Sequence, residues 1–187
     1  MTTSEPKFIG KRISVRRTKE EIIVEITQQI ERWQEALLIG WLAAWGFCGI
    51  VFITNIFTAT NSSLQILLVV LSSIWLYFMV SIIKAYLWRK KGREIIVMKK
   101  GKMSIQNAIG KLGKLEEFNY QNIFKLGLVK RDPGNFFAFL DNSFWVIGGD
   151  KIGFSYSGSK VRLGKQLALK DAELLVRILE SGIRELK

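Results

Sequence analysis

The sequence predicts an α+β membrane protein with three parts: an N-terminal amphipathic helix, a transmembrane hairpin of two helices, and a small antiparallel β domain with a C-terminal helix. Three observations support this class. The stretch from Ala36 to Ile83 contains no Asp, Glu, Lys or Arg. Short apolar or alternating runs, separated by turn residues, follow it, and the chain then ends on apolar residues at helical spacing. The predicted domains are residues 1–35, 36–88 and 94–187.

The N-terminal 35 residues are polar and charged but contain an amphipathic pattern. The sequence Thr18-Lys19-Glu20-Glu21 matches a capping box at the start of a helix. Apolar residues then recur at three- and four-residue spacing: Ile22, Ile23, Ile26, Ile30, Trp33 and Leu37. The pattern predicts a helix that lies on the membrane surface or packs against the β domain. Upstream of it, Ile13–Val15 has the composition of a short strand.

The charge-free stretch is long enough to cross a membrane twice. A spanning helix needs about 20 apolar residues to cross roughly 30 Å of hydrocarbon. The stretch holds two such segments, separated by one polar interruption at Thr58–Ser63. A pair of buried helices in a soluble core is the alternative, but such helices usually keep a polar edge. We therefore expect a helical hairpin in a membrane.

The flanking charges predict how the hairpin is oriented. A basic cluster without acidic residues follows the second segment and comprises Lys84, Arg89, Lys90, Lys91 and Arg93. Lys and Arg concentrate on the cytoplasmic side of spanning helices. We therefore expect a multi-pass protein of the cell (plasma or inner) membrane with both termini in the cytoplasm. The single cysteine, Cys48, excludes a disulfide scaffold and fits this location.

Small residues in the two spans are candidates for close helix packing, which lipid alone does not drive. They face either the other span or a foreign subunit. The candidates are Gly40, Ala43, Gly46 and Gly49 in the first span, and Ser72 and Ser73 in the second. Neither span contains an ionisable group of the kind that marks ion paths, which argues against a self-contained transporter or channel.

The C-terminal segment predicts about seven short strands and a final helix, arranged as a small antiparallel barrel or sandwich with the helix over one open end. Turn signals such as Arg131–Asn135 separate the runs. An aromatic cluster, Phe136, Phe137, Phe139, Phe144 and Trp145, is expected in its core. The helix begins at Asp171, and the apolar or alternating runs that supply the strands are Glu94–Met98, Met103–Gln106, Leu115–Phe118, Ile123–Val129, Phe136–Leu140, Phe144–Ile147, Ile152–Tyr156 and Val161–Leu163.

Three short motifs carry a resemblance to a known family. They are Phe154-x-Tyr156-x-Gly158, Arg162-x-Gly164 and Asp171-Ala172-Glu173. With the strand order, residues 36–187 resemble bacterial membrane proteins in which a helical hairpin precedes a PH-like domain, of the pleckstrin-homology superfold. The resemblance implies seven strands capped by a C-terminal helix.

The composition disfavours catalysis. The chain has no His, and its one Cys lies in the first span, so general acid–base residues and soluble thiol nucleophiles are missing. Clusters with metal-ligand spacing are also missing. We expect no catalytic residue, no metal and no cofactor, although an Asp or Lys acting from a different fold leaves a cryptic enzyme as an alternative.

The remaining chemistry is binding. Lys99, Lys100 and Lys102 form a basic loop between the first two predicted strands of the domain, and in PH domains that loop often holds anionic headgroups. The resemblance therefore implies a candidate lipid or phosphate site, which Arg89, Lys90, Lys91 and Arg93 would complete. The alternative is a solvated hairpin tip.

Two functions follow as hypotheses. The first is a membrane-anchored, non-enzymatic adaptor that binds a protein partner or serves as a small subunit or assembly factor of a membrane complex. The second is a module that binds anionic lipids at the inner leaflet. Expected partners are membrane lipids and a protein partner or membrane complex, with a homo-oligomer as a further alternative. Nucleic acid is not expected, because the basic charge comes without a recognised binding motif.

Overall fold

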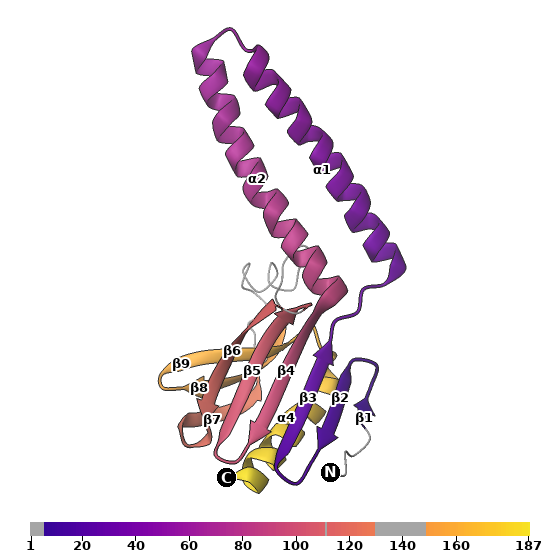
Figure 1. Ribbon diagram of the computed structural model, residues 1–187, viewed down its shortest axis with the longest axis vertical. Helices are drawn as coiled ribbons and strands as arrows, with labels where there is room; N and C mark the ends of the chain where they lie inside the picture. Colours follow the sequence, from indigo (N-terminus) through magenta and orange to yellow (C-terminus); the bar gives the residue numbers. More distant parts are fainter. Residues whose placement is uncertain (1–5, 111, 130–148) are drawn as a thin grey trace. The chain divides into compact units, whose positions relative to one another are not determined.

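The chain is organised as two units that differ from the predicted domains. The computed structural model describes residues 6–110, 112–129 and 149–187. Among these, residues up to Gln29 and from Lys91 onward form one unit, the β unit, and Ile30–Lys90 form the other, the helical hairpin (Figure 1). The N-terminal segment is therefore part of the β unit, although the sequence pattern separated the two. The predicted turn, strands and aromatic cluster within 131–147 lie outside the described residues.

The helical hairpin consists of α1 (Arg32–Thr58) and α2 (Ser62–Lys91). Both helices are long and apolar enough to span a membrane, as the charge-free stretch predicts. In each helix the most apolar 18-residue window is mostly exposed, with 11% and 6% of its residues buried. A core helix of a soluble protein would be mostly buried. Helix α2 continues through the basic cluster to Lys91, three residues beyond the predicted end of the hairpin.

The predicted N-terminal amphipathic helix is wrong. The segment instead forms three strands, β1 (Lys7–Ile9), β2 (Ile13–Arg17) and β3 (Glu21–Thr27), and β2 contains the strand expected at Ile13–Val15. The Thr18 hydroxyl, which was expected to cap a helix, accepts a 3.2 Å hydrogen bond from the Glu21 amide and donates one of 2.8 Å to its carbonyl. These bonds close the β2–β3 turn.

Pairing with a strand distant in sequence explains the difference. Strand β3 pairs antiparallel with β4 (Gly92–Lys99), from Glu21 opposite Lys99 to Thr27 opposite Arg93. Alternate residues Ile22, Val24 and Ile26 are buried, a period of two that fits a strand. The helical hairpin is thus inserted between two adjacent, paired strands.

The β unit contains two antiparallel sheets (Figure 1). One has six strands in sequence order, completed by β5 (Lys102–Ile109) and β6 (Leu112–Asn119). A 3₁₀ turn, Tyr120–Asn122, leads to the second sheet, formed by β7 (Ile123–Leu128), β8 (Asp150–Tyr156) and β9 (Ser159–Lys165). Neither sheet closes into a barrel within the described residues, so the barrel alternative is not what forms there. Helix α4 (Leu169–Leu186) follows β9 and confirms the predicted C-terminal helix.

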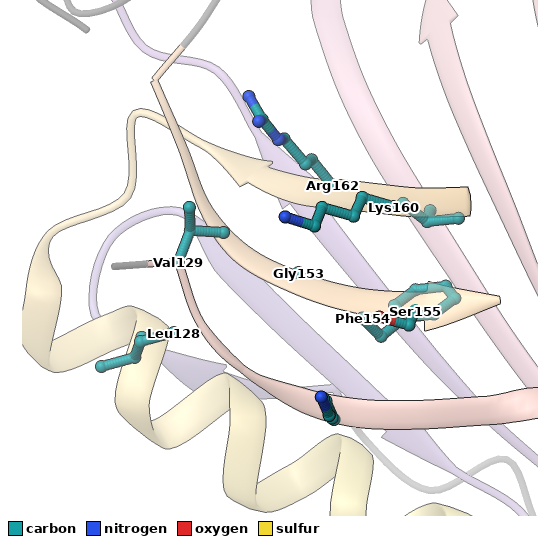
Figure 2. Close-up of a pocket in the computed structure, with 9 residues that line it drawn as sticks. Leu128, Val129, Gly153, Phe154, Ser155, Lys160 and Arg162 are labelled. Atoms are coloured by element: carbon teal, nitrogen blue, oxygen red, sulfur yellow. The ribbon is translucent and has the colours of Figure 1, made fainter. Parts of the chain in front are cut away.

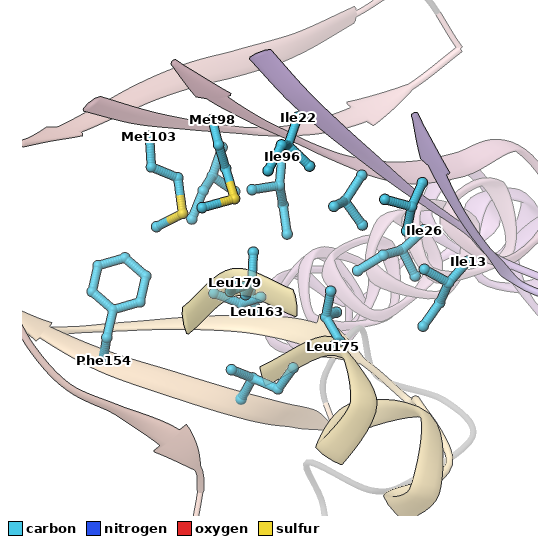
Figure 3. Close-up of a cluster of buried hydrophobic side chains, with 14 of the residues drawn as sticks. Ile13, Ile22, Ile26, Ile96, Met98, Met103, Phe154, Leu163, Leu175 and Leu179 are labelled. Atoms are coloured by element: carbon cyan, nitrogen blue, oxygen red, sulfur yellow. The ribbon is translucent and has the colours of Figure 1, made fainter. Parts of the chain in front are cut away.

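The core lies between the two sheets and α4 (Figure 3). The six-stranded sheet contributes Ile22, Ile96 and Met98, the second sheet Phe154 and Leu163, and the helix Leu175 and Leu179, most of them without solvent exposure. Helix α4 approaches β4 closely at Gly182, where a Cβ atom would lie 2.7 Å from the Met98 methyl carbon. Because both sheets and α4 pack on this core, β9 lies against the end of β3 and the start of β4.

Candidate functional site

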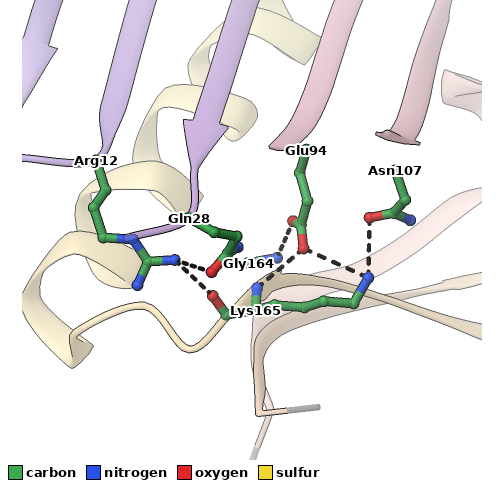
Figure 4. A network of polar contacts seen from close by, with 6 residues as sticks. All are labelled: Arg12, Gln28, Glu94, Asn107, Gly164 and Lys165. Atoms are coloured by element: carbon green, nitrogen blue, oxygen red, sulfur yellow. Dashed lines mark hydrogen bonds and ion pairs between the residues drawn. The ribbon is translucent and has the colours of Figure 1, made fainter. Parts of the chain in front are cut away.

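A network of polar side chains joins the two sheets where β3 ends and β4 begins (Figure 4). Its centre is Glu94, whose side chain is fully buried on the same face of β4 as Ile96 and Met98. Burying a carboxyl group is costly unless hydrogen bonds or a cation compensate. The surrounding residues supply both.

The partners of Glu94 come mainly from β9. The backbone amides of Gly164 and Lys165 donate hydrogen bonds of 2.7 and 3.2 Å to its two oxygens. The Lys165 ammonium lies 3.7 Å from Glu94 Oε1 and donates a 3.0 Å hydrogen bond to Asn107 Oδ1. Burial raises the pKa of the Glu94 carboxyl above its ordinary value, against the opposing effects of Lys165 and the two amides. The carboxyl group therefore ties β4 of one sheet to β9 of the other.

Arg12 makes a second connection from the β1–β2 turn. Its guanidinium donates to the carbonyls of Gln166 (2.7 Å) and Lys165 (3.2 Å) after β9. It also donates to the Thr27 carbonyl (2.9 Å) and to Gln28 Oε1 (2.5 Å) at the end of β3. Burial lowers the pKa of Arg12, partly opposed by Glu94 and Asp171. The planar guanidinium can satisfy these separate acceptors at once, which a Lys could not do.

The two strand ends are also bonded directly, because the Gln28 amide donates a 3.1 Å hydrogen bond to the Gly92 carbonyl. Gln28 is the first residue after β3, and Gly92 is the first residue of β4. The chain therefore leaves the β unit for the hairpin and re-enters it at two bonded residues. The network holds this exit and re-entry point to both sheets.

The arrangement can hold strands together, and we see no reacting group in it. It contains two cations (Arg12 and Lys165), one carboxylate (Glu94) and two side-chain amides (Gln28 and Asn107). Each forms a hydrogen bond or ion pair with another member or with the backbone. Among the described residues, no group of three His, Cys, Asp or Glu side chains could hold a metal ion. The chemistry present is that of a structural clamp.

The pattern of buried polar residues could have been found in part from the sequence. Glu94, Ile96 and Met98 alternate along one predicted strand and therefore share a face. The sequence alone thus shows an acidic residue on the inward-facing side of this strand. The other members of the network carried no signal, since they come from four other segments of the chain: Arg12, Gln28, Asn107 and Lys165.

The cations predicted to form one lipid site are not brought together within the β unit. Arg93 and Lys99 lie near opposite ends of β4, about 20 Å apart at roughly 3.3 Å per residue. Lys99 forms an ion pair of 3.4 Å with Glu21, and Lys102 one of 3.0 Å with Glu117. Lys100 is exposed in the β4–β5 turn. The basic loop therefore lies at the end of β4 away from the point where the chain joins the hairpin.

The other predicted cations, Arg89, Lys90 and Lys91, lie in the last turn of α2. The Lys90 ammonium forms an ion pair of 2.5 Å with Glu35 of α1 and donates a 3.0 Å hydrogen bond to the Tyr86 hydroxyl oxygen. Tyr86 also bonds Glu35, at 3.1 Å. Lys90 thus joins the two helices at the open end of the hairpin.

The predicted helix-packing residues occupy different surroundings. Gly49 lies directly beneath the Trp75 ring, where any larger residue would collide, and Trp75 Nε1 donates a 3.0 Å hydrogen bond to the Trp45 carbonyl. Gly40 and Gly46 have open space beside them. Ala43 is exposed, Ser72 is half-buried, and the Ser73 hydroxyl bonds the Val69 carbonyl of its own helix.

Comparison with known proteins does not assign the chain to a family. No protein-family model matches it, and no curated protein sequence matches it. The resemblance to PH-like membrane proteins therefore stays a prediction from the sequence.

Proposed function

We propose that the protein is a membrane-anchored, non-enzymatic adaptor, in which the helical hairpin is the anchor and the β unit binds a protein partner or serves as a small subunit or assembly factor of a membrane complex. The observation that carries the proposal is the outer surface of the hairpin. Large apolar side chains cover it, among them Phe57 and Ile66, exposed by 83% and 67%. Water disfavours such a surface, whereas acyl chains do not.

The β unit is, in this proposal, a PH-like domain whose first three strands precede the hairpin in sequence. Two antiparallel sheets around one core, followed by a C-terminal helix, support the assignment. The basic residues after the second apolar segment favour the cytoplasmic side of the cell membrane for the β unit and both termini. The lack of His anywhere in the chain supports a role without catalysis.

The membrane location is tested by extraction and protease protection. The full chain is expected to stay in the membrane pellet after alkaline carbonate treatment, and protease added from the cytoplasmic side should cleave the β unit. A chain that is released by carbonate, or that stays monodisperse in buffer without detergent, would overturn the anchor. Cleavage only from the opposite side would overturn the orientation.

The adaptor role is tested by the composition of the complex in mild detergent. We expect the full chain to migrate as part of a larger assembly of defined stoichiometry. The Arg12→Ala variant, which loosens the β unit, should no longer migrate with this assembly. A chain that migrates as a free monomer or as a homo-oligomer alone would argue against this role. The lipid-binding alternative at Lys99 and Lys102 is less favoured, because Glu21 and Glu117 already neutralise these cations.

A further inference from the structure

The outer face of the three-stranded sheet contains a hollow of about 270 Å³ (Figure 2). It lies entirely within the β unit, and residues of β7, β8 and β9 line it together with Val129. It is distinct from the Glu94 network, which lies at the ends of the strands. Its volume is slightly below the range of about 300–1,000 Å³ typical of small-molecule sites, so the group it can hold is small.

Strand register explains why the sheet is hollowed at this place. Gly127 pairs with Gly153, which pairs in turn with Arg162, so two of three neighbours in this row have no side chain. A Cβ atom at Gly127 would meet open space. In the adjacent row Ser155 pairs with Lys160. Small residues therefore form the floor, and long side chains of β9 stand beside it.

Three cations surround this floor. Lys160 and Arg162 extend from β9 on one side, with the Lys160 ammonium directed toward Gly153 (Figure 2), and Lys125 lines the hollow from β7. Lys125 sits at the irregularity between Phe124 and Gly127 with φ of 54°. A side chain in this left-handed region is strained, and such strain gathers at binding sites.

The lining of the hollow carries no negative charge to balance Lys125 and Lys160. None of the lining residues is acidic. Within the described residues, neither Lys125 nor Lys160 forms an ion pair with a carboxylate, in contrast to Lys99 and Lys102 on the other sheet. Cations held around a small polar floor attract an anion of high charge density.

We propose that this hollow binds a phosphate monoester. Such a group carries a charge of about −1.5 to −2 near neutral pH and has three strong acceptor oxygens. Lys125, Lys160 and Arg162 supply the positive charge, and the Ser155 hydroxyl supplies a neutral donor at the floor. The group belongs either to a lipid headgroup or to a small soluble phosphate ester. The inference does not depend on the adaptor role.

The test uses the full chain in mild detergent and native mass spectrometry. The probes are glycerol 3-phosphate and phosphatidic acid, which share the monoester, and phosphatidylcholine is the zwitterionic control. We expect at least one monoester probe to bind and phosphatidylcholine not to bind. If both probes bind, the phosphate monoester is sufficient for binding. If only phosphatidic acid binds, the ligand is a lipid. If neither binds, or phosphatidylcholine binds equally, the proposal is wrong.

Variants separate the hollow from general basic charge. Lys125→Glu with Lys160→Glu should weaken binding at least about tenfold, which corresponds to about 1.4 kcal/mol, because two charge-assisted contacts are lost. Lys99→Glu with Lys100→Glu makes the same charge change at the β4–β5 turn and should leave binding within about twofold. Ser155→Leu keeps every charge but fills the floor, and should also reduce binding about tenfold. Equal losses of binding affinity in the two double variants, or unchanged binding in Ser155→Leu, would overturn the proposed site. A thermal unfolding transition of each variant shows that it is folded.

Discussion

The β unit buries a core of apolar side chains between its layers, whereas the helical hairpin exposes most of its own. In the β unit, Ile22, Ile96 and Leu179 are at most 1% exposed, between two sheets and a helix. In the hairpin, two helices contact each other along one side only, so Phe57, Ile66 and residues like them point outward. The helices of the hairpin are richer in apolar residues than the elements of the β unit, yet they bury fewer of them.

The difference shows which interactions each region depends on. The β unit brings its own apolar environment and can use polar groups inside it, as the Glu94 network does. The hairpin leaves most of its apolar side chains uncovered. Its interhelical polar contacts include Glu35 with Tyr86 and Lys90, Trp75 with the Trp45 carbonyl, and Gln65 with the Ile56 carbonyl. We therefore expect the same kind of substitution to have a large effect in one region and a small effect in the other.

The largest difference is expected for truncation of an apolar side chain. Leu179→Ala should destabilise the β unit by about 2–5 kcal/mol, because a fully buried leucine leaves a cavity. Ile66→Ala, at a position that is 67% exposed on the hairpin, should leave the unfolding midpoint unchanged. Denaturant unfolding of the full chain in detergent, followed by circular dichroism, measures both. Similar shifts of the unfolding midpoint in the two variants would contradict the expected difference between the β unit and the hairpin.

The second comparison introduces a charge. Ile74→Arg places a cation within α2 and should disfavour membrane insertion by about 3 kcal/mol, seen as protein released by alkaline carbonate. Leu115→Arg on β6 is the matched control, since Leu115 is similarly exposed at 54% against 50% for Ile74. The control should stay in the pellet with the unmodified protein. Retention of Ile74→Arg at the same level would mean that α2 does not meet lipid.

The third test weakens the clamp at the strand ends. Arg12→Ala removes the donor of four hydrogen bonds that join the β1–β2 turn to β3 and β9. Charge-assisted bonds of this kind are worth about 1.5–3 kcal/mol, so we expect a loss of about 2–3 kcal/mol in the free energy of unfolding. Lys11→Ala removes a neighbouring exposed cation and should have little effect. A loss no larger than that of the control would show that the clamp contributes nothing.

The smallest effect is a pH dependence of stability that comes from Glu94 in the β unit. Burial raises the pKa of Glu94, so the folded chain keeps a proton that the unfolded chain releases above about pH 4.5. The contribution of Glu94 to stability should therefore fall as pH rises from that value through the raised pKa. Glu94→Gln cannot titrate and should lack this decline, which thermal unfolding across a pH series measures. Glu173→Gln, an exposed control, should retain it, and an identical pH profile in all three proteins would contradict the expected shift.

Local patterns predicted the elements that need no distant partner. The hairpin follows from an uninterrupted absence of charge, and α4 follows from apolar residues at helical spacing after β9. Most strands of 94–129 and 149–165 also lie where alternation and turn residues predict them. In each case one stretch of chain contains the whole signal.

The segment before the hairpin shows where local patterns fail. Ile22, Ile23 and Ile26 fit a helical face, but Ile22, Val24 and Ile26 equally fit a strand face. Thr18 and Glu21 fit a helix cap and also a β turn. Only β4, which follows some 65 residues later, decides between them by offering an unpaired edge. The candidate lipid-site cations show a related limit, because Arg93 and Lys99, close in sequence, lie near opposite ends of β4.

The amino-acid sequence by itself determined that this chain has two helix-length apolar segments without charge between Ala36 and Ile83, because hydropathy is a property of each residue and sums along the chain. The tertiary structure decided that the N-terminal residues are strands, that Glu94, Arg12 and Lys165 meet, and that a hollow ringed by cations forms on β7–β9. Pairing across a sheet depends on residues far apart in sequence, and its free energy appears only when those residues are brought together.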